Sequence, residues 1–167
     1  GRLMFENLKG TIADLLGDTS KATALPSAGD AFDENYSAPE VSATLVEGVE
    51  LLARDVAARL QSDVARRDRV LGCKPTRPDD ATCARAFVER MGRRVLRRPL
   101  AVAEVDRFVA LHKSAALDDA APNFYAGVDA VLRALLQDPE FIFRVEVGTP
   151  VPGRPGVHRL GPFELAS

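Results

Sequence analysis

The chain has 167 residues, of which 46% are hydrophobic and 28% charged, and its formal net charge is −2. This is enough apolar material for one compact domain, or for two small ones that share a core, and too much for a disordered chain. No run approaches the roughly 18 uninterrupted apolar residues of a membrane span. The near-neutral charge argues against nucleic-acid binding by bulk charge but leaves a local basic patch open.

Both ends of the sequence suggest a piece of a longer protein. The chain opens Gly1-Arg2-Leu3 without an initiator methionine, and a helical pattern begins at once. It closes on residues 163–167, Phe-Glu-Leu-Ala-Ser, where a new amphipathic pattern has just started. Domains usually end in polar, poorly ordered residues. We therefore expect further sequence after Ser167.

Apolar residues recur at helical spacing along most of the chain. The first stripe ends at Gly17, which is placed to terminate its helix in the left-handed conformation. Residues 18–40 are rich in Asp, Ser, Pro, Ala and Gly and predict a long connection, which we expect Phe32 to anchor in the core. Ser42 is the expected N-cap of the next helix. The expected principal helices cover residues 3–17, 42–60, 80–96, 102–114 and 123–136.

Several breaks separate these helices. Segment 63–71 is very polar and either continues or breaks the helix before it, and Asp79 or Asp80 is expected to cap the next one. Glycines and prolines between residues 145 and 160 leave room for a short β-hairpin. The sequence thus predicts an all-α bundle of about five principal helices with a long N-terminal connection. The expected divisions are residues 1–72, 73–147 and 148–167, the last a turn-rich linker and the start of a following domain.

The chain has two cysteines, Cys73 and Cys83, on either side of a loop that contains prolines. A metal site needs closer spacing and further thiol or imidazole ligands, and these are missing. A disulfide needs only two thiols within reach, and it would stabilise the fold by about 3 kcal/mol. We expect a structural disulfide, with free core thiols or a reactive pair as the alternatives. A disulfide implies an oxidising compartment: periplasm, cell surface or exterior.

Arginines crowd the helix that follows this loop, between Arg85 and Arg98. Guanidinium groups could bind phosphate, carboxylate or nucleic acid through their planar fork. Alternatively, they lie near a helix C-terminus, where cations are favoured, and pair with the chain's own acids. We favour the structural interpretation. The candidates for anion or partner interaction are Arg90, Arg93, Arg94, Arg97 and Arg98.

Other polar residues give weaker signals. The acidic residues 30–35 could hold calcium, but they lack the alternation and glycine of an EF-hand loop, and turn formation explains them more simply. His112 falls on the apolar face of its helix, where packing is a simpler interpretation than haem ligation. A covalent c-type haem motif, nucleophile elbows and nucleotide-binding fingerprints are absent. The sequence assigns no catalytic residue, no metal ligand and no cofactor within this chain.

Several segments together resemble a family of large exported planctomycete and myxobacterial proteins, built from serial domains of unknown function and often fused to a cytochrome c domain. The resemblance is carried by Arg2-Leu3 with Thr11-Ile12 and Asp14-Leu15-Leu16-Gly17, by Phe32-Asp33 with Asn35, by Gly92-Arg93-Arg94 with Leu96-Arg97-Arg98-Pro99-Leu100, by Pro139 with Phe141 to Glu146, and by Phe163 to Ser167. Ala101 stands where the family has a capping Thr, which costs about 1 kcal/mol. The resemblance implies export and a following C-terminal portion, with any c-type haem in another domain or chain. It supplies no catalytic residues.

Three functional hypotheses follow. The favoured one is a non-catalytic helical module of an exported, redox-associated protein that packs against the rest of that protein or a partner chain. It predicts an exposed apolar interface formed by Phe141, Ile142, Phe143, Phe163 and Leu165. The alternatives are part of a redox or hydrolytic enzyme whose active site lies mainly elsewhere, or a binder of anions or nucleic acid through the Arg85–Arg98 helix.

Overall fold

A computed structural model of the chain describes residues 10–17, 43–118, 120–142, 149–152 and 158–159. Several sequence predictions fall outside these residues. They concern the connection at 18–40 with its anchor Phe32, the acidic residues 30–35, the N-cap Ser42, and the interface residues Phe143, Phe163 and Leu165.

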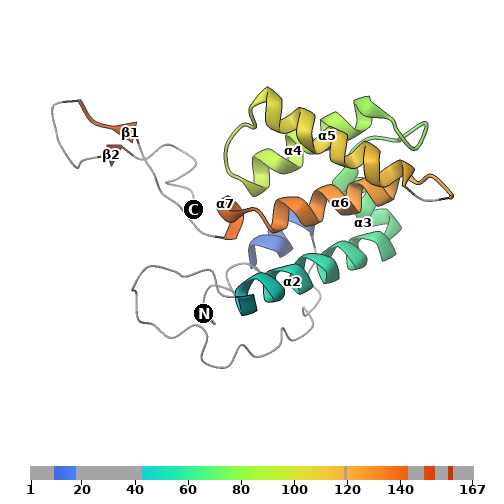
Figure 1. The fold of residues 1–167 in the computed structure, drawn as a ribbon, viewed down its shortest axis with the longest axis horizontal. Coiled ribbons are helices and arrows are strands. Elements are labelled where there is room, and N and C mark those ends of the chain that lie inside the picture. The colour runs from blue at the N-terminus through green and yellow to red at the C-terminus, as the bar shows by residue number, and fades with distance from the viewer. Residues whose placement is uncertain (1–9, 18–42, 119, 143–148, 153–157, 160–167) are drawn as a thin grey trace.

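The fold is all-α, as the sequence predicts (Figure 1). The helices are a segment at residues 10–16, α2 (Ala43–Ser62), α3 (Val64–Leu71), α4 (Ala81–Val95), α5 (Val102–Leu117), α6 (Phe124–Leu136) and the short α7 (Pro139–Ile142). Where the sequence leaves room for a hairpin, β1 (Thr149–Pro150) pairs antiparallel with β2 (His158–Arg159), with Thr149 opposite Arg159. Among the described helices none is long and apolar enough to cross a membrane.

The polar segment after α2 is a separate helix with its own caps. The Asp63 side chain accepts a hydrogen bond from the backbone N–H of Arg66 at 3.0 Å, which starts α3. Gly72 ends α3 with a φ of +66°, a conformation that glycine adopts without strain. Gly17 ends the first helix in the same way, at +65°, as the sequence predicts.

Helix α6 forms the centre of the bundle. Figure 1 shows it running between α5 and α2, and it also packs against α4 and α7. Its apolar positions repeat at helical spacing and form a broad stripe, which the neighbouring helices bury. The buried residues of α6 are Phe124, Gly127, Val128, Val131, Leu132, Leu135 and Leu136.

A single hydrophobic core joins the described helices. Buried residues of the first helix, α2, α4, α5, α6 and α7 belong to one cluster, which includes Leu71 and Cys83. These two residues lie on either side of the expected boundary between residues 72 and 73. The two expected modules therefore pack together, and the division into 1–72, 73–147 and 148–167 stays a prediction.

Candidate functional site

Cys73 and Cys83 form a disulfide, which confirms the pairing that the sequence favours. Their Cα atoms lie 5.8 Å apart, within the usual range for this bond. Cys83 is buried in the first turn of α4, whereas Cys73 is half-buried in the loop after α3. The disulfide therefore fastens the end of α3 to the start of α4.

Asp80 is the residue that caps α4, which decides between the two aspartates that the sequence offers. Its carboxylate accepts from the backbone N–H of Cys83 at 3.1 Å, and from the backbone N–H and hydroxyl of Thr76 at 3.1 and 3.0 Å. The hydrogen bond from Cys83, followed by those from Thr76, lowers the pKa of Asp80. One charged side chain thus closes the disulfide loop and starts the arginine-rich helix.

Arg90 binds the C-terminal end of α3. Its Nη2 donates to the carbonyl oxygen of Val70 at 2.7 Å and to that of Leu71. The last carbonyls of a helix lack intrahelical donors and carry partial negative charge. A Cβ on Gly72 would lie 3.0 Å from the same Nη2. Arg90 and the disulfide therefore join the end of α3 to α4 at two points.

Arg94 makes the corresponding contact with the first helix. Its Nη2 donates to the carbonyl oxygen of Asp14 at 3.1 Å. Arg93, one position before it, is exposed, and Arg97 is half-buried beyond the end of α4. Arg97 has a φ of +55°, which a residue with a side chain rarely adopts. This strained turn directs the chain from α4 to Arg98.

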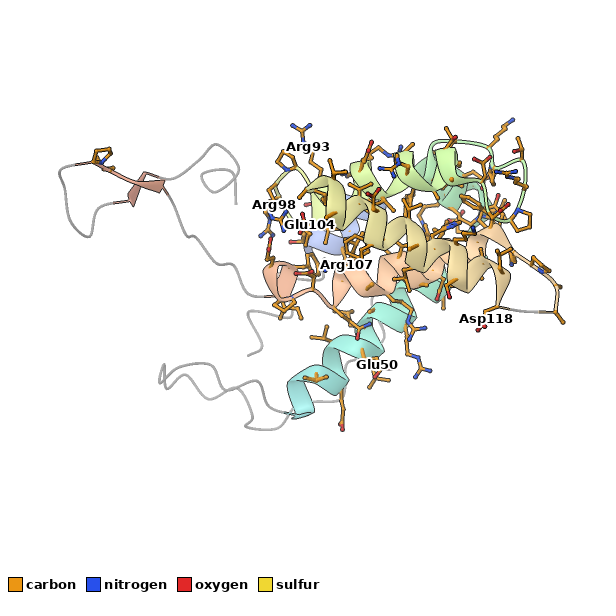
Figure 2. All side chains as sticks on the ribbon, turned by 45° about the horizontal axis from the view of Figure 1, so that its top comes forward. Glu50, Arg93, Arg98, Glu104, Arg107 and Asp118 are labelled. Atoms are coloured by element: carbon orange, nitrogen blue, oxygen red, sulfur yellow. A yellow bond between two sulfur atoms is a disulfide. The ribbon has the colours of Figure 1, made fainter. Side chains whose placement is uncertain are left out.

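Arg98 joins the N-terminal turns of two helices. Its guanidinium donates to both carboxylate oxygens of Glu104 at 2.8 Å, and to those of Glu140 at 2.8 and 2.9 Å. Glu104 lies in the first turn of α5 and Glu140 in that of α7. Figure 2 shows Arg98 and Glu104 together at the end of the bundle opposite Asp118. The two hydrogen-bonded carboxylates raise the pKa of Arg98.

Glu104 also supplies part of the cap that Ala101 lacks. Ala101 makes no side-chain cap hydrogen bond, but its backbone N–H donates to Glu104 Oε2 at 2.7 Å. The hydrogen bond from Arg98, and then that from Ala101, lower the pKa of Glu104 to about 2. The start of α5 is therefore held by Glu104 and Arg98, although Ala101 offers no capping side chain.

Several arginines between Arg85 and Arg98 have partners elsewhere in the chain. Arg90, Arg94 and Arg98 donate to acceptors of the same chain, and those acceptors lie in other helices. This arrangement favours the structural interpretation, because a guanidinium aimed at a helix end or a carboxylate has fewer donors left for a ligand. Anion or partner binding through Arg90, Arg93, Arg94, Arg97 and Arg98 stays a prediction.

His112 is buried where α5 meets α6. Its side chain is 1% exposed, its ring centroid lies 4.4 Å from that of Phe124, and Nε2 has no hydrogen-bond partner among the described residues. Burial lowers the pKa of His112, although a hydrogen bond with the Phe124 backbone and the charge of Asp80 oppose this. The sequence places His112 on the apolar face of its helix, and the structure buries it there. Packing in the core is sufficient to explain its position.

The expected exposure of Phe141 is wrong. Phe141 is 1% exposed and belongs to the core, and Ile142 is half-buried against it. The reason is α7, which begins at Pro139 and turns Phe141 back toward α6. The Asp138 side chain starts this turn by accepting from the Glu140 N–H at 2.9 Å. The exposed large apolar side chains of the described chain are Val46, Leu51, Val64, Val102, Leu111 and Leu117.

Sequence reasoning missed the structural roles of three residues. Gly127 lets α5 and α6 approach closely, because a Cβ there would lie 2.5 Å from Cδ2 of His112. The signal was a lone glycine inside a helical pattern. Glu140 pairs with Arg98 from 42 residues away, and no local pattern indicates such a pair. Glu104, three residues after Ala101, could have been found from capping-box spacing.

The described residues hold no group of three or more His, Cys, Asp or Glu side chains placed to bind a metal ion. A search of curated proteins and a search of solved structures each found no match to the chain. Residues 83–146, less than half of the chain, match a family model described as PSD5: Protein of unknown function (DUF1595). This segment, which runs from Cys83 through α7 and contains Arg98, Glu104 and His112, is thus similar to a domain of unknown function.

Proposed function

We propose that this chain is a non-catalytic helical module of an exported multi-domain protein, and that it packs against the rest of that protein or a partner chain. The observation that carries the proposal is the use of the arginines. Arg90, Arg94 and Arg98 each join α4, or the turn after it, to another helix of the same chain. The most chemically suggestive cluster in the sequence therefore has a structural task.

The disulfide supports the exported location. Disulfides persist in oxidising compartments and are rare in the cytosol. Cys73 and Cys83 are bonded to each other and are the only cysteines in the sequence. Any c-type haem of the redox-associated protein is consequently attached in another domain or chain, since thioether attachment uses free cysteines.

The Arg98 bridge supports a scaffolding task. It fixes the start of α7 relative to the start of α5 through two carboxylates on one guanidinium. A bidentate pair restricts orientation as well as distance. The start of α7 is therefore held in a fixed position beside the start of α5. We propose that Phe143, Phe163 and Leu165 contribute to the surface that packs against the neighbouring domain or chain.

The location is tested by trapping thiols in intact cells of the native source with an alkylating reagent before fractionation. We expect the peptides holding Cys73 and Cys83 to be found disulfide-linked and unalkylated, in the periplasmic or extracellular fraction. Alkylated cysteines in a cytosolic fraction would contradict export.

The structural role of the arginines is tested by titrating the chain with short duplex DNA and, separately, with inorganic phosphate. Anisotropy of labelled DNA and isothermal calorimetry for phosphate are the readouts, each at low and physiological salt. We expect no saturable binding at physiological salt. Saturable binding that weakens steeply with salt, and that Arg93→Ala removes, would contradict the proposal and indicate an anion-binding module instead.

Packing against a neighbour is tested by hydroxyl-radical footprinting of the isolated chain and of the intact native protein. We expect Phe143, Phe163 and Leu165 to react less in the intact protein, while exposed Val102 serves as a reference for a described surface position. Equal reactivity of the three residues in both samples would reject this surface.

A further inference from the structure

His112 lies in the contact between α5 and α6, close to Gly127. These two helices lie side by side (Figure 1). The imidazole ring is tilted by 57° to the Phe124 ring at a centroid distance of 4.4 Å. Gly127 also lies against the ring, because a Cβ there would come within 2.5 Å of His112 Cδ2. The ring thus fills a space that has no room for an added methyl group.

The polar atoms of this imidazole suit the neutral form. One hydrogen bond joins the ring to the backbone of Phe124. Nε2 is buried and has no partner in the part of the chain that the structure describes. A neutral imidazole presents only a lone pair at one nitrogen, whereas an imidazolium presents a second N–H and a positive charge. Burying that N–H without an acceptor is strongly unfavourable.

The charges around the ring do not compensate for this burial. From α4, the cap residue Asp80 attracts a positive charge on the ring. From α6, His112 faces Phe124 and Gly127, whose side chains are uncharged. Phe124 is the first residue of α6, and a helix N-terminus carries partial positive charge, which disfavours a nearby cation. The Asp80 carboxylate also accepts hydrogen bonds from the backbone N–H groups of Cys83 and Thr76, so its negative charge is shared with the cap of α4.

We propose that His112 makes the α5–α6 contact acid-sensitive, so that mild acidification separates these two helices before the rest of the bundle unfolds. Protonation would place an unsatisfied N–H and a charge in the buried contact with Phe124 and Gly127. Because Gly127 closes the space beside the ring, the helices must move apart to admit water. The α2–α6 contact contains no buried histidine among the described residues and would persist.

The direction of the pH dependence follows from linkage. The folded state holds His112 neutral to lower pH than the unfolded chain does, because burial lowers its pKa. The stability that the neutral His112 contributes is fully present above its ordinary pKa of 6.5, and it falls as the pH drops below that value. Each pH unit below that value raises the equilibrium constant for opening about tenfold from this one group, until the folded pKa is reached.

The experiment combines histidine NMR with hydrogen exchange on the full 167-residue chain. His158→Gln removes the other histidine, so that the remaining imidazole signal belongs to His112. We expect that signal to titrate below pH 6.5. Hydrogen exchange of α5 and α6 peptides, corrected for the intrinsic pH dependence, should accelerate between pH 7.5 and 5.5, while α2 peptides stay protected. His112→Gln should remove this pH dependence.

Distinct outcomes would overturn the proposal. They are titration of His112 at or above 6.5, equal acceleration of α2, α5 and α6, and an unchanged pH dependence in His112→Gln. If His112→Gln does not fold, the NMR titration and the peptide pattern of the histidine-containing protein decide the matter without it.

Discussion

Gly127 of α6 faces His112 of α5 so closely that the added Cβ of an alanine would lie 2.6 Å from the His112 carbonyl oxygen. Side chains can rotate away from such a contact, but a backbone carbonyl inside a helix moves only with its helix. Position 127 therefore determines how closely α5 and α6 approach. This spacing in turn determines how well water is excluded from the buried imidazole.

The first prediction concerns this contact. Gly127→Ala should lower the free energy of unfolding by about 2 kcal/mol or more, because overpacking outweighs the better helix propensity of alanine. Urea denaturation followed by circular dichroism measures it. Gly10→Ala is the matched control, since a Cβ at Gly10 meets nothing within 4 Å, and it should be neutral or slightly stabilising. Equal effects of the two substitutions would show that α5 and α6 can separate freely.

The second prediction concerns the disulfide. Replacing both Cys73 and Cys83 by serine should lower the free energy of unfolding by about 3 kcal/mol, because the unfolded chain regains the entropy of an open loop. Reduction of the unmodified protein should produce a similar loss. The double variant should then be insensitive to reductant, which separates the effect of the bond from that of the reagent. A double variant as stable as the oxidised protein would mean that Arg90 and Asp80 alone hold the loop.

The third prediction concerns the binding of Arg90 to the end of α3. Arg90→Met keeps the aliphatic stem but leaves the Val70 and Leu71 carbonyls without their donor, and should cost about 1–2 kcal/mol. Arg85→Met is the control, because Arg85 pairs with Asp106 on the surface and both side chains are well exposed. The control should change stability by less than about 0.5 kcal/mol. Thermal denaturation at fixed pH and salt compares the two, and an equal loss would contradict a special role for Arg90.

The fourth prediction concerns acid stability through Glu104. Its pKa is about 2 in the folded state against an ordinary 4.5. The folded state thus binds fewer protons than the unfolded chain, so the stabilisation is present above pH 4.5 and lost as the pH falls toward 2. Its side chain is 23% exposed and that of Arg98 37%. Allowing for solvent screening, the loss should be about 1–2 kcal/mol.

Urea denaturation at pH 5 and pH 2.5 measures this loss. Glu104→Gln should be less stable at pH 5 and should lose less on acidification. Asp106→Asn removes a more exposed carboxylate from the same helix and controls for the change in net charge. High salt should reduce the difference between Glu104→Gln and the unmodified protein. Loss of stability through His112 begins at a higher pH, near its ordinary pKa of 6.5, so the same titration in His112→Gln isolates the contribution of Glu104. An unchanged acid response in Glu104→Gln would show that the Arg98 bridge contributes nothing to stability.

Local features of the sequence determined the principal helices and the disulfide. The 3.6-residue repeat depends on neighbours within about four positions, which is why the apolar stripe of α6 is visible without a structure. Gly17 ends its helix for a similarly local reason, since it adopts a φ of +65° without steric conflict. Cys73 and Cys83 lie only 10 residues apart, so their pairing also depends on a short stretch of chain.

The tertiary structure determined which hydrogen-bond acceptors the arginine side chains contact. Arg98 reaches Glu140 across 42 residues and Arg94 reaches the Asp14 carbonyl across 80. Such contacts depend on how helices cross, which no repeat in the sequence specifies. The same cause explains the wrong prediction for Phe141: Pro139 indicated a break, but whether the chain then left the bundle or turned back into it depended on space beside α6. A sequence can state that a side chain is apolar or charged, whereas its burial and its acceptor depend on packing.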